Sequence, residues 1–396
     1  MWFSLAGAGL IILVGALALA APKIRRKLKK KRWAHHEGNA ALDYPVRTDW
    51  TRSGGKVNYS AFVYFDVDRD GRYGELDRTL SGIHVRLYKS NKFVRRSITN
   101  INGFANFASS TKQRRAPINK PSKMRFEVSV PPGWVCTSDN AVQSRDFRLI
   151  PGSPTGIGAD SLPDPIGLAP RRYIRGTCGD DANLRLSFAS TGPEFSEHAL
   201  KPNTPFEIDV PDGADTLILA NEFRDRRVSL PPYPVDLGCV SNAALSDQLR
   251  DLEVIDFEAL SASGLKKVPN GYRGFDWTGL NMMSREFTPG CDGGSNGAIT
   301  GQNICYTSSG HPGEIRGDVP FYFHSIALTS AWSQAEGETV IVQVFDGEKL
   351  CREDRITIST FTPVIYAPME PSVTSIRIAS EHYWQVIIDA VVVGRN

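Results

Sequence analysis

The chain has 396 residues, of which 41% are hydrophobic and 22% charged, so it is long enough for two or three domains with buried cores. Of its 46 Lys and Arg residues, eight lie in the run Lys23–Arg32, which leaves 38 against 43 acidic residues elsewhere and a formal charge of −5 on the body. A mildly acidic body argues against a nucleic-acid-binding protein, which needs a basic face on the domain itself.

The N-terminus begins with an apolar segment. Residues Trp2–Ala21 (WFSLAGAGLIILVGALALAA) carry no charge, and about twenty helical residues at roughly 1.5 Å each span a hydrocarbon core of about 30 Å. We therefore predict one membrane-spanning helix in residues 2–21, with a basic stalk that extends to residue 36. We expect Lys23–Arg32 to contact anionic lipid headgroups. Residues 37–56 form a polar connector.

Residues 57–150 have the pattern of a β-domain. Runs such as SGIHVRLYKS, GFANFAS and KMRFEVSV alternate apolar and polar residues, which is typical of half-buried strands. Pro131, Pro132 and Gly133 end the last of these runs.

An acidic loop follows the first strand run, NYSAFVYFD. In the stretch FDVDRDGRYGELD, Asp66, Asp68 and Asp70 lie two residues apart and Gly71 follows at once. In calcium loops alternate side chains supply hard oxygen ligands, and a glycine allows a sharp turn. We predict a structural calcium site at the three aspartates.

The sequence leaves two choices for the residue that closes this loop. Glu75 and Asp77 are both candidates for the closing calcium ligand. The alternative to a metal site is a β-turn whose aspartates cap backbone amides.

The order of these motifs resembles the B-type domains of Sdr- and Cna-like bacterial surface adhesins. After the acidic loop, residues 80–87 (LSGIHVRL) match "L-x-G-V-x-V-x-L", residues 99–107 (TNINGFANF) match "T-x-x-x-G-x-Y-x-F", and residues 130–134 (VPPGW) match "V-x-x-P-x-G-Y". The resemblance covers about 80 residues. It implies an immunoglobulin-like or prealbumin-like β-sandwich with calcium at Asp66, Asp68, Asp70 and a later acid.

Residues 151–240 predict a second small β-domain or an elaboration that packs on the first. LRLSFAS, TPFEIDVP and DTLILANEF are strand-like, and KPNTP and PDGAD are turn signals. Cys136, Cys178 and Cys239 fall in or near this region, so a disulfide across it is an expectation whose connectivity the spacing leaves open.

Residues 250–396 predict an all-β sandwich. FYFHSIALTSAWS, ETVIVQVFDGEKLCREDRITIST and HYWQVIIDAVVVG read as strands, and Asp346-Gly347 is a two-residue hairpin signal. Cys291 and Cys305 bracket a glycine-rich segment. If oxidised, they would close that loop with a stabilisation of roughly 3 kcal/mol.

This last region is similar to the jelly-roll domains of secreted bacterial proteins related to carbohydrate-binding modules. The matching runs are residues 255–258 (IDFE), 271–277 (GYRGFDW), 342–347 (VQVFDG) and 388–394 (IDAVVVG). The resemblance implies a second structural calcium shared by the first and last strands, at Asp256, Glu258 and Asp389. The alternative is that these acids are polar edge residues.

Aromatic side chains of the last region are candidates for stacking on sugars. They are Tyr272, Trp277, Tyr306, Trp332, Tyr383 and Trp384. We expect most of them in the core, because such a sandwich needs large inward residues. Tyr306 and His311, in or beside the loop TSSGHPGE, are the pair we expect to be exposed and in contact with a ligand.

Several motifs of common enzyme classes are absent from the sequence: the P-loop, H-E-x-x-H, and G-x-G-x-x-G between a strand and a helix. The fold class we predict is mainly β, with tandem β-sandwiches behind one transmembrane helix. The function we predict is non-enzymatic: a calcium-stabilised, membrane-anchored protein that binds a protein or glycan partner. The alternative is an accessory subunit of a membrane complex, with its β-domains clamped on extrinsic faces.

Sequence features disagree on which side of the membrane the body of the protein lies. The basic run after the apolar segment places the body in the cytoplasm by the positive-inside rule. Ala18-Leu19-Ala20 is a signal-peptidase pattern, and the six cysteines, an even number without C-x-x-C, suggest disulfides. Together with the calcium loop, these features favour a body in the periplasm or at the cell surface, with a cytoplasmic-facing body as the alternative.

Overall fold

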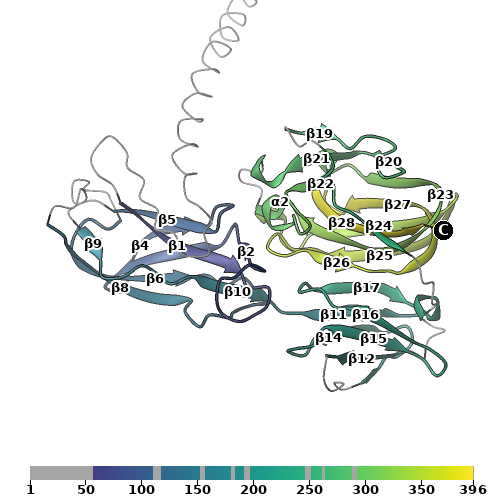
Figure 1. Cartoon of the computed structure of the whole chain (residues 1–396), viewed down its shortest axis with the longest axis horizontal. Helices are drawn as coiled ribbons and strands as arrows, with labels where there is room; N and C mark the ends of the chain where they lie inside the picture. The colour runs from purple at the N-terminus through teal and green to yellow at the C-terminus, as the bar shows by residue number, and fades with distance from the viewer. Residues whose placement is uncertain are drawn as a thin grey trace, which may run out of the picture.

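The computed structural model describes residues 57–109, 117–151, 157–179, 183–190, 197–245, 251–260, 264–287 and 292–395. These residues form three β-sandwiches (Figure 1), which agrees with the predicted tandem arrangement. Within the same ranges, no helix has the length and apolar character needed to cross a bilayer. The predicted membrane helix, basic stalk and connector lie outside the described residues.

The N-terminal sandwich is organised around β1 (Val57–Phe65). This strand pairs antiparallel with β5 (Phe104–Ser109) over most of its length and with β2 (Arg78–Thr79) at its end. It also pairs in parallel with β10 (Ile166–Pro170), which pairs with β7 (Trp134–Cys136). The first sheet therefore takes in residues beyond the boundary that we expected at residue 150.

The second sheet of this sandwich covers one face of the first. Its strands, in spatial order, are β4 (Lys92–Ile98), β3 (His84–Lys89), β6 (Ser122–Val128), β8 (Val142–Leu149) and β9 (Ile157–Ala159). Because side chains alternate along a strand, Tyr59, Ala61, Val63 and Phe65 of β1 enter the core between the sheets. The intervening Phe62 and Tyr64 form an aromatic cluster on the opposite face with Phe104.

The middle sandwich has two small sheets. One holds β14 (Pro205–Asp209), β11 (Tyr173–Cys178) and β17 (Val235–Val240), and the other holds β13 (His198–Ala199), β12 (Arg185–Ala189), β15 (Thr216–Ala220) and β16 (Asp225–Ser229). The core between them includes Ile174, Phe188 and Leu219. β17 also pairs in parallel with β26 (Val364–Tyr366), so hydrogen bonding runs without a break into the C-terminal sandwich.

The C-terminal sandwich is built around the long strand β23 (Gly313–Ser330), which takes part in two layers. Its first half pairs with β20 (Phe275–Thr278) and β27 (Glu370–Ser380), and β24 (Thr339–Asp346) and β25 (Lys349–Thr357) extend that layer. Its second half pairs with β26 and β28 (Val386–Arg395). The second layer continues through β22 (Asn303–Thr307), β21 (Leu280–Ser284) and β19 (Lys266–Lys267), with β18 (Leu252–Ile255) on β28.

The layers of the C-terminal sandwich enclose the largest apolar core, which includes Ile315, Val342 and Ile376 from one layer and Leu328 and Ile388 from the other. The predicted hairpin forms, with its turn one residue later than Asp346-Gly347: Asp346 pairs with Lys349, so Gly347 and Glu348 make the turn, and Gly347 has a positive φ of 62°. The short helices are η1 (Asn242–Leu245), η2 (Arg285–Phe287), α2 (Asp292–Asn296), η3 (Ser308–Gly310) and η4 (Ser333–Ala335).

The middle and C-terminal sandwiches are joined by Arg352 on β25. Its guanidinium, 11% exposed, bonds the carboxylates of Asp354 (2.6 Å) and Glu370 (3.3 Å). It also donates to the carbonyl oxygens of Leu237 (3.2 Å) and Cys239 on β17. Gly238 lies between these two carbonyls with a φ of +60°, and a Cβ at this position would collide with Asp354.

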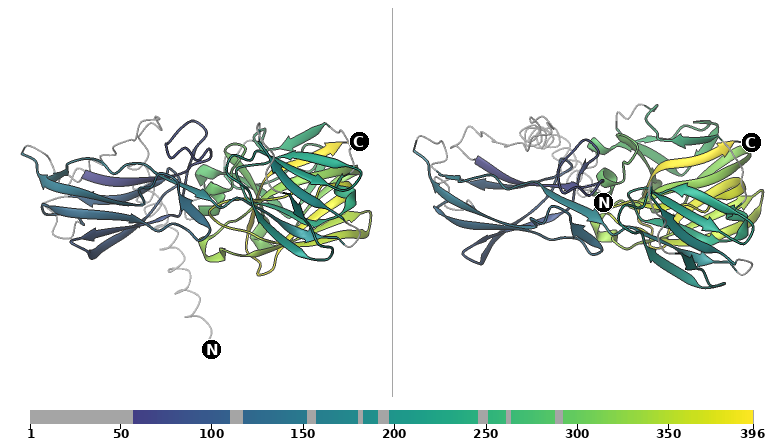
Figure 2. Two further views of the ribbon diagram at one scale, coloured as in Figure 1. Left: turned by 90° about the horizontal axis from the view of Figure 1, so that it is seen from below. Right: turned by 60° about the horizontal axis from the view of Figure 1, so that its bottom comes forward.

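The N-terminal sandwich is joined to the C-terminal one by side chains that follow β2. The two further views in Figure 2 show the N-terminal sandwich projecting to one side of the other two. Arg78 donates to the carbonyl oxygens of Ala298 (3.1 Å) and Ile299. The backbone of Ser81 exchanges two hydrogen bonds with the side-chain amide of Asn296 on α2. The Ser81 hydroxyl donates to Asp292 Oδ1 on the same helix (2.8 Å).

Replacement of Arg352 tests how much its network holds. In Arg352→Met the partly buried carboxylates of Asp354 and Glu370 and two carbonyls lose their donor, so we expect a loss of about 3 kcal/mol in the free energy of unfolding. The matched control is Arg355→Met, which removes an exposed ion pair to Glu381 on the same strand and should cost less than about 1 kcal/mol. Urea unfolding of both variants measures this, and equal losses would contradict a special role for Arg352.

Candidate functional site

The acidic loop after β1 brings three predicted ligands together. The carboxylates of Asp66, Asp68 and Asp70 each place an oxygen within 4.8 Å of the other two. Asp66 is fully buried, because β1 ends beneath the loop, whereas Asp68 and Asp70 are exposed. This is the one such acidic group among the residues that the structure describes.

Backbone amides bend the loop around these carboxylates. Asp66 Oδ2 accepts a hydrogen bond from the N–H of Gly71 (2.9 Å), and Asp70 Oδ1 accepts one from Arg72 (2.7 Å). Gly71 has a φ of +75° and lies against the carbonyl of Thr137, so it fits without a side chain at this turn. The turn-capping alternative therefore describes part of what these aspartates do.

The structure separates the two candidates for the closing ligand from the three-aspartate group. Asp77 accepts from the N–H of Val67 (2.9 Å) through Oδ1 and from that of Gly74 (2.7 Å) through Oδ2, so it closes the loop through the backbone. Glu75 is exposed. Neither belongs to the three-carboxylate group.

Tyr73, which sequence reasoning missed, anchors the same loop. Its ring packs edge-on against Phe62 (centroids 4.9 Å apart) and Tyr64 (5.2 Å) on the outer face of β1. The sequence signal is an aromatic residue inside an otherwise polar loop that follows a strand with aromatics on both faces.

The loop carries uncompensated negative charge. Asp66 Oδ1 is buried and has no hydrogen-bond partner among the described residues. Burial raises the pKa of Asp77 to about 6, and the charges of Asp66 and Asp68 add to that effect against hydrogen bonds that lower it. An orphan carboxylate oxygen beside two further carboxylates is a donor set that suits a hard cation such as calcium.

The second predicted calcium set is not brought together as a metal-binding group in the described chain. Asp389, on β28, is fully buried and accepts four hydrogen bonds, from the N–H groups of Ile299 (2.7 Å), Thr300 (3.0 Å) and Ala390 (2.8 Å) and from the Thr300 hydroxyl (2.7 Å). With all its acceptor positions used by the protein, it holds the segment before β22 rather than presenting oxygen to an ion.

Glu258 and Asp256 behave in the same way. Glu258 Oε1 accepts from the N–H groups of Gln302 (2.8 Å) and Asn303 (2.6 Å), and Asp256 accepts from the N–H of Glu258 (3.2 Å). Asp389 and Glu258 therefore fasten the segment 299–303 to the C-terminal sandwich, and Asp256 caps the N–H of Glu258. The alternative of polar edge residues does not describe Asp389, which is fully buried.

Of the two residues that we expected to be exposed, His311 is exposed and Tyr306 is not. Tyr306 is 6% exposed and packs with Met283, Ile304 and Ile387. β22 is hydrogen-bonded on both edges, by β21 and β28, and all five of its residues are buried, so both of its faces are covered. Trp277 is buried at 3% exposure, as we expected of most aromatics in this region.

The exposed aromatics lie in the loop between β27 and β28, beside His311. Tyr383 is 75% exposed and Trp384 37%. Gly310 lies against the backbone of Tyr383, and a Cβ there would collide with the Tyr383 carbonyl, so the loops that carry His311 and Tyr383 are in contact. Sequence reasoning placed Trp384 in a strand, but β28 begins two residues later, at Val386.

Hydrogen bonds fix the loop that carries these two rings. The N–H of His382 donates to Glu338 Oε1 (2.9 Å), and its Nδ1 lies 3.1 Å from Glu338 Oε2. The indole N–H of Trp332 donates to Gln385 Oε1 (3.0 Å). The aromatic pair is thus presented by a loop that is tied down at both ends.

The cysteines do not support the expected disulfides. Cys136, Cys305 and Cys351 carry free thiols. Cys305 is buried, and burial raises its pKa. Cys291, the expected disulfide partner of Cys305, lies outside the described residues.

No protein-family model and no curated protein matches the chain. Similarities to solved structures are weak. The Bacillus anthracis TIE protein is 12% identical, with 47% of this chain and 34% of that protein covered and a TM-score of 0.23, so this chain spans about a third of its length. The K2 cleaved adhesin domain of Lys-gingipain is 9% identical, with 37% and 100% covered and a TM-score of 0.24. A variant of the major pilin from Streptococcus pyogenes is 7% identical, with 79% and 97% covered and a TM-score of 0.21. Scores this low do not establish a shared fold.

The buried carboxylate of Asp389 makes a pH prediction. Burial raises its pKa from 3.8 to about 6, against hydrogen bonds from Thr300, Ala390 and Ile299 that lower it. Because the folded carboxyl takes up its proton at a higher pH than the unfolded one, its stabilising contribution is complete below about pH 4 and is lost as the pH rises to about 6.

The variant Asp389→Asn removes this titration. The unfolding free energy of the native chain minus that of the variant should therefore fall by up to about 3 kcal/mol between about pH 4 and about pH 6 and stay level above that range. Urea unfolding at a series of pH values measures the difference. A difference that does not change with pH would show that Asp389 does not titrate in this range.

Proposed function

We propose that the chain is a non-enzymatic, calcium-stabilised binding protein of the cell surface or periplasm, anchored to the membrane through residues 2–21. The observation that carries the proposal is Asp66, a fully buried carboxylate with an unpartnered oxygen, within 4.8 Å of two further carboxylates. A buried charge without a partner is costly, and a bound cation removes that cost.

The exposure of the other two carboxylates indicates the affinity class. Asp68 and Asp70 are open to water, and Asp77 is engaged by backbone amides, so few protein ligands are fixed in advance. Sites with few rigid ligands bind calcium weakly, with dissociation constants of about 10⁻⁴–10⁻³ M in extracellular modules. Such a site fills only where calcium is abundant, which favours a body outside the cytoplasm. The free thiols of Cys136, Cys305 and Cys351 add no support for that location.

The acidic loop lies at the junction between the N-terminal and middle sandwiches. Arg69, inside the acidic loop, donates to the carbonyl of Pro170, where β10 ends and the chain enters the middle sandwich. It also lies 3.8 Å from Asp212 of the middle sandwich. An ion that orders this loop would therefore order the junction between the first two sandwiches.

The partner-binding surface that we propose is the loop of Tyr383 and Trp384. Two exposed aromatic rings on a fixed loop, with His311 beside them, offer apolar faces edged by polar groups. Sugar rings have the matching chemistry, an apolar face with hydroxyls around it. We therefore favour a glycan as the partner. A protein partner, as in the accessory-subunit alternative, is the other outcome of the test.

Calcium binding is tested on Asp66. Calcium at millimolar concentration should stabilise the native chain by about 1 kcal/mol, a rise of several degrees in Tm, because the ion binds only the folded loop. In Asp66→Asn this response should disappear. Asp256→Asn, in the second acidic set, is the matched control and should keep the full response. Thermal unfolding with calcium and with a chelator measures both, and an unchanged response in Asp66→Asn would sink the calcium site.

Glycan binding is tested on the aromatic loop. A glycan array identifies a ligand for the native chain, and Tyr383→Ala and Trp384→Ala should each weaken that ligand by about tenfold through loss of stacking area. Phe223→Ala, which removes an 87% exposed ring from the middle sandwich, is the control and should bind normally. If no glycan on the array binds and the chain is recovered in a stoichiometric protein complex after mild detergent extraction, the glycan proposal is wrong. The accessory-subunit alternative then replaces it.

A further inference from the structure

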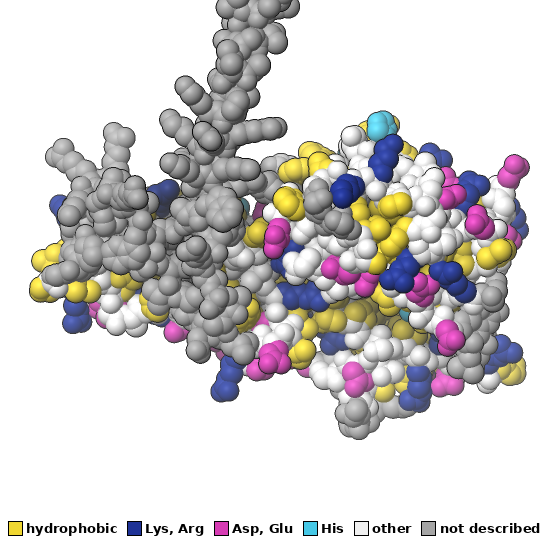
Figure 3. Space-filling model, turned by 45° about the horizontal axis from the view of Figure 1, so that its top comes forward, with side chains coloured by type: hydrophobic (Ala, Val, Ile, Leu, Met, Phe, Trp, Pro, Cys, Tyr) yellow, Lys and Arg dark blue, Asp and Glu magenta, His cyan; other side chains and the backbone are white. Residues whose placement is uncertain are grey.

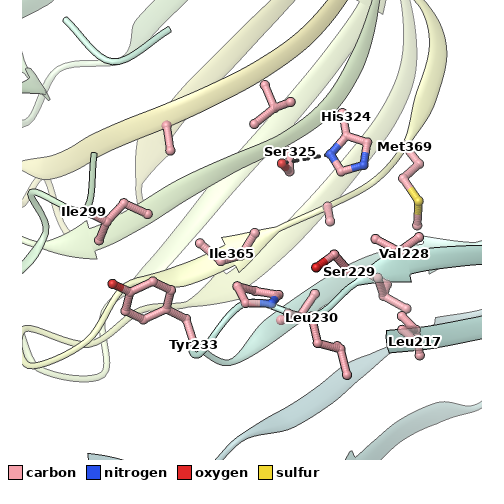
Figure 4. Close-up of a pocket in the computed structure, with 16 residues that line it drawn as sticks. Leu217, Val228, Ser229, Leu230, Tyr233, Ile299, His324, Ser325, Ile365 and Met369 are labelled. Atoms are coloured by element: carbon pink, nitrogen blue, oxygen red, sulfur yellow. Dashed lines mark hydrogen bonds between the residues drawn. The ribbon is translucent and has the colours of Figure 1, made fainter. Parts of the chain in front are cut away.

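A cavity of about 290 Å³ lies between the middle and C-terminal sandwiches. Figure 3 shows hydrophobic side chains gathered along the boundary of the two domains, and Figure 4 shows the cavity from within. One wall comes from β15, β16 and β17, including Leu217 and Leu237, and the other from β23, β26 and β28, including Ile365 and Val392. Domain boundaries of this kind are a common location for small-molecule sites.

The wall is apolar and uncharged. Of the described residues that line the cavity, none is Asp, Glu, Lys or Arg. The few polar groups are the side chains of His324, Ser325, Ser229 and Tyr233 (Figure 4). A charged ligand would therefore lose its hydration without gaining a counter-charge.

His324 supplies one polar contact. Its Nδ1 lies 3.0 Å from the Ser325 hydroxyl, and the other ring nitrogen has no partner among the described residues. Burial, assisted by the charge of Arg226, lowers the pKa of His324 to about 4. The ring is therefore neutral at pH 7, and its second nitrogen is available for a single uncharged hydrogen bond.

Two residues of the cavity wall have strained backbone. Met369 (φ 53°) and Ala390 (φ 47°) line it, and both adopt the left-handed conformation that side chains with a Cβ disfavour. Ala390 lies where the pairing of β23 with β28 shifts register between Ser325 and Ala327, and its N–H bonds Asp389. The wall therefore contains a β-bulge that a buried carboxylate fixes by a hydrogen bond. A specific backbone feature of this kind distinguishes the cavity from a simple packing defect.

We propose that this cavity binds a small, uncharged and largely apolar molecule that makes one hydrogen bond to the free ring nitrogen of His324. An apolar cavity of about 150 Å³ admits benzene, so this larger one suits a bicyclic aromatic compound or an acyl chain of moderate length. The site is independent of the acidic loop and of the Tyr383 loop, because none of their residues lines it. Since both sandwiches supply the wall, the ligand also fastens them together.

The test compares two probes with one ring system. N-phenyl-1-naphthylamine is uncharged, and 8-anilinonaphthalene-1-sulfonate is the same molecule with a sulfonate. On the full chain we expect saturable fluorescence enhancement with the uncharged probe and at least about tenfold weaker binding of the sulfonate. Ser229→Phe blocks the mouth of the cavity from an exposed position and should abolish the saturable signal.

Three further variants complete the test. Ala367→Leu fills the cavity from its other wall and serves if Ser229→Phe does not fold. His324→Leu keeps the apolar wall and should weaken the uncharged probe severalfold. Phe223→Ser, remote from the cavity, should change nothing, which separates the site from exposed aromatics. Equal binding of the two probes, or a saturable signal that survives a folded cavity-filling variant, would overturn the proposal.

Discussion

One guanidinium, 11% exposed, bridges the middle and C-terminal sandwiches beside the backbone pairing of β17 with β26. Arg352 crosses the boundary, and its bonds to the carbonyls of Leu237 and Cys239 set where β17 lies against β25. Gly238 is required between those carbonyls, because any side chain there would strike Asp354. A second link, from Arg175 to buried Asp236 (2.6 Å) and to the Thr357 carbonyl (2.9 Å), acts in the same direction. The shape of the interdomain cavity follows from this placement, since β17 forms part of its wall.

Three aspartates of this chain show that burial alone does not define a metal ligand. Asp389 and Asp66 are both fully buried, but Asp389 receives four hydrogen bonds, whereas Asp66 keeps one oxygen without a donor. Asp77 uses both oxygens on backbone amides. What separates a candidate ligand from a structural cap is the number of local donors that reach the carboxylate, and this is a property of the folded backbone.

The sequence predicted features that local pattern determines. The strand runs, the hairpin near Asp346-Gly347 and the spacing that brings Asp66, Asp68 and Asp70 together all depend on residues close in the chain. It failed where distant segments decide the outcome. Tyr306 is buried because side chains from other strands, such as Met283 and Ile387, pack around it, and the first sandwich extends to Pro170 because β10 returns to β1. The interdomain cavity, whose lining comes from segments between residues 217 and 392, leaves no local pattern to read.

Two of the parallel pairings, β1 with β10 and β17 with β26, join strands far apart in the chain and impose an order on folding. During vectorial synthesis the first sheet cannot be completed until β10 has emerged, because β1 has its parallel neighbour there. The middle sandwich then waits with the edge of β17 unpaired until residues 364–366 arrive as β26. An apolar strand edge left open during synthesis is a template for wrong pairing with other chains. The nascent chain is therefore most exposed to aggregation between completion of β17 and arrival of β26, and protection by a chaperone would have its largest effect on yield in that interval.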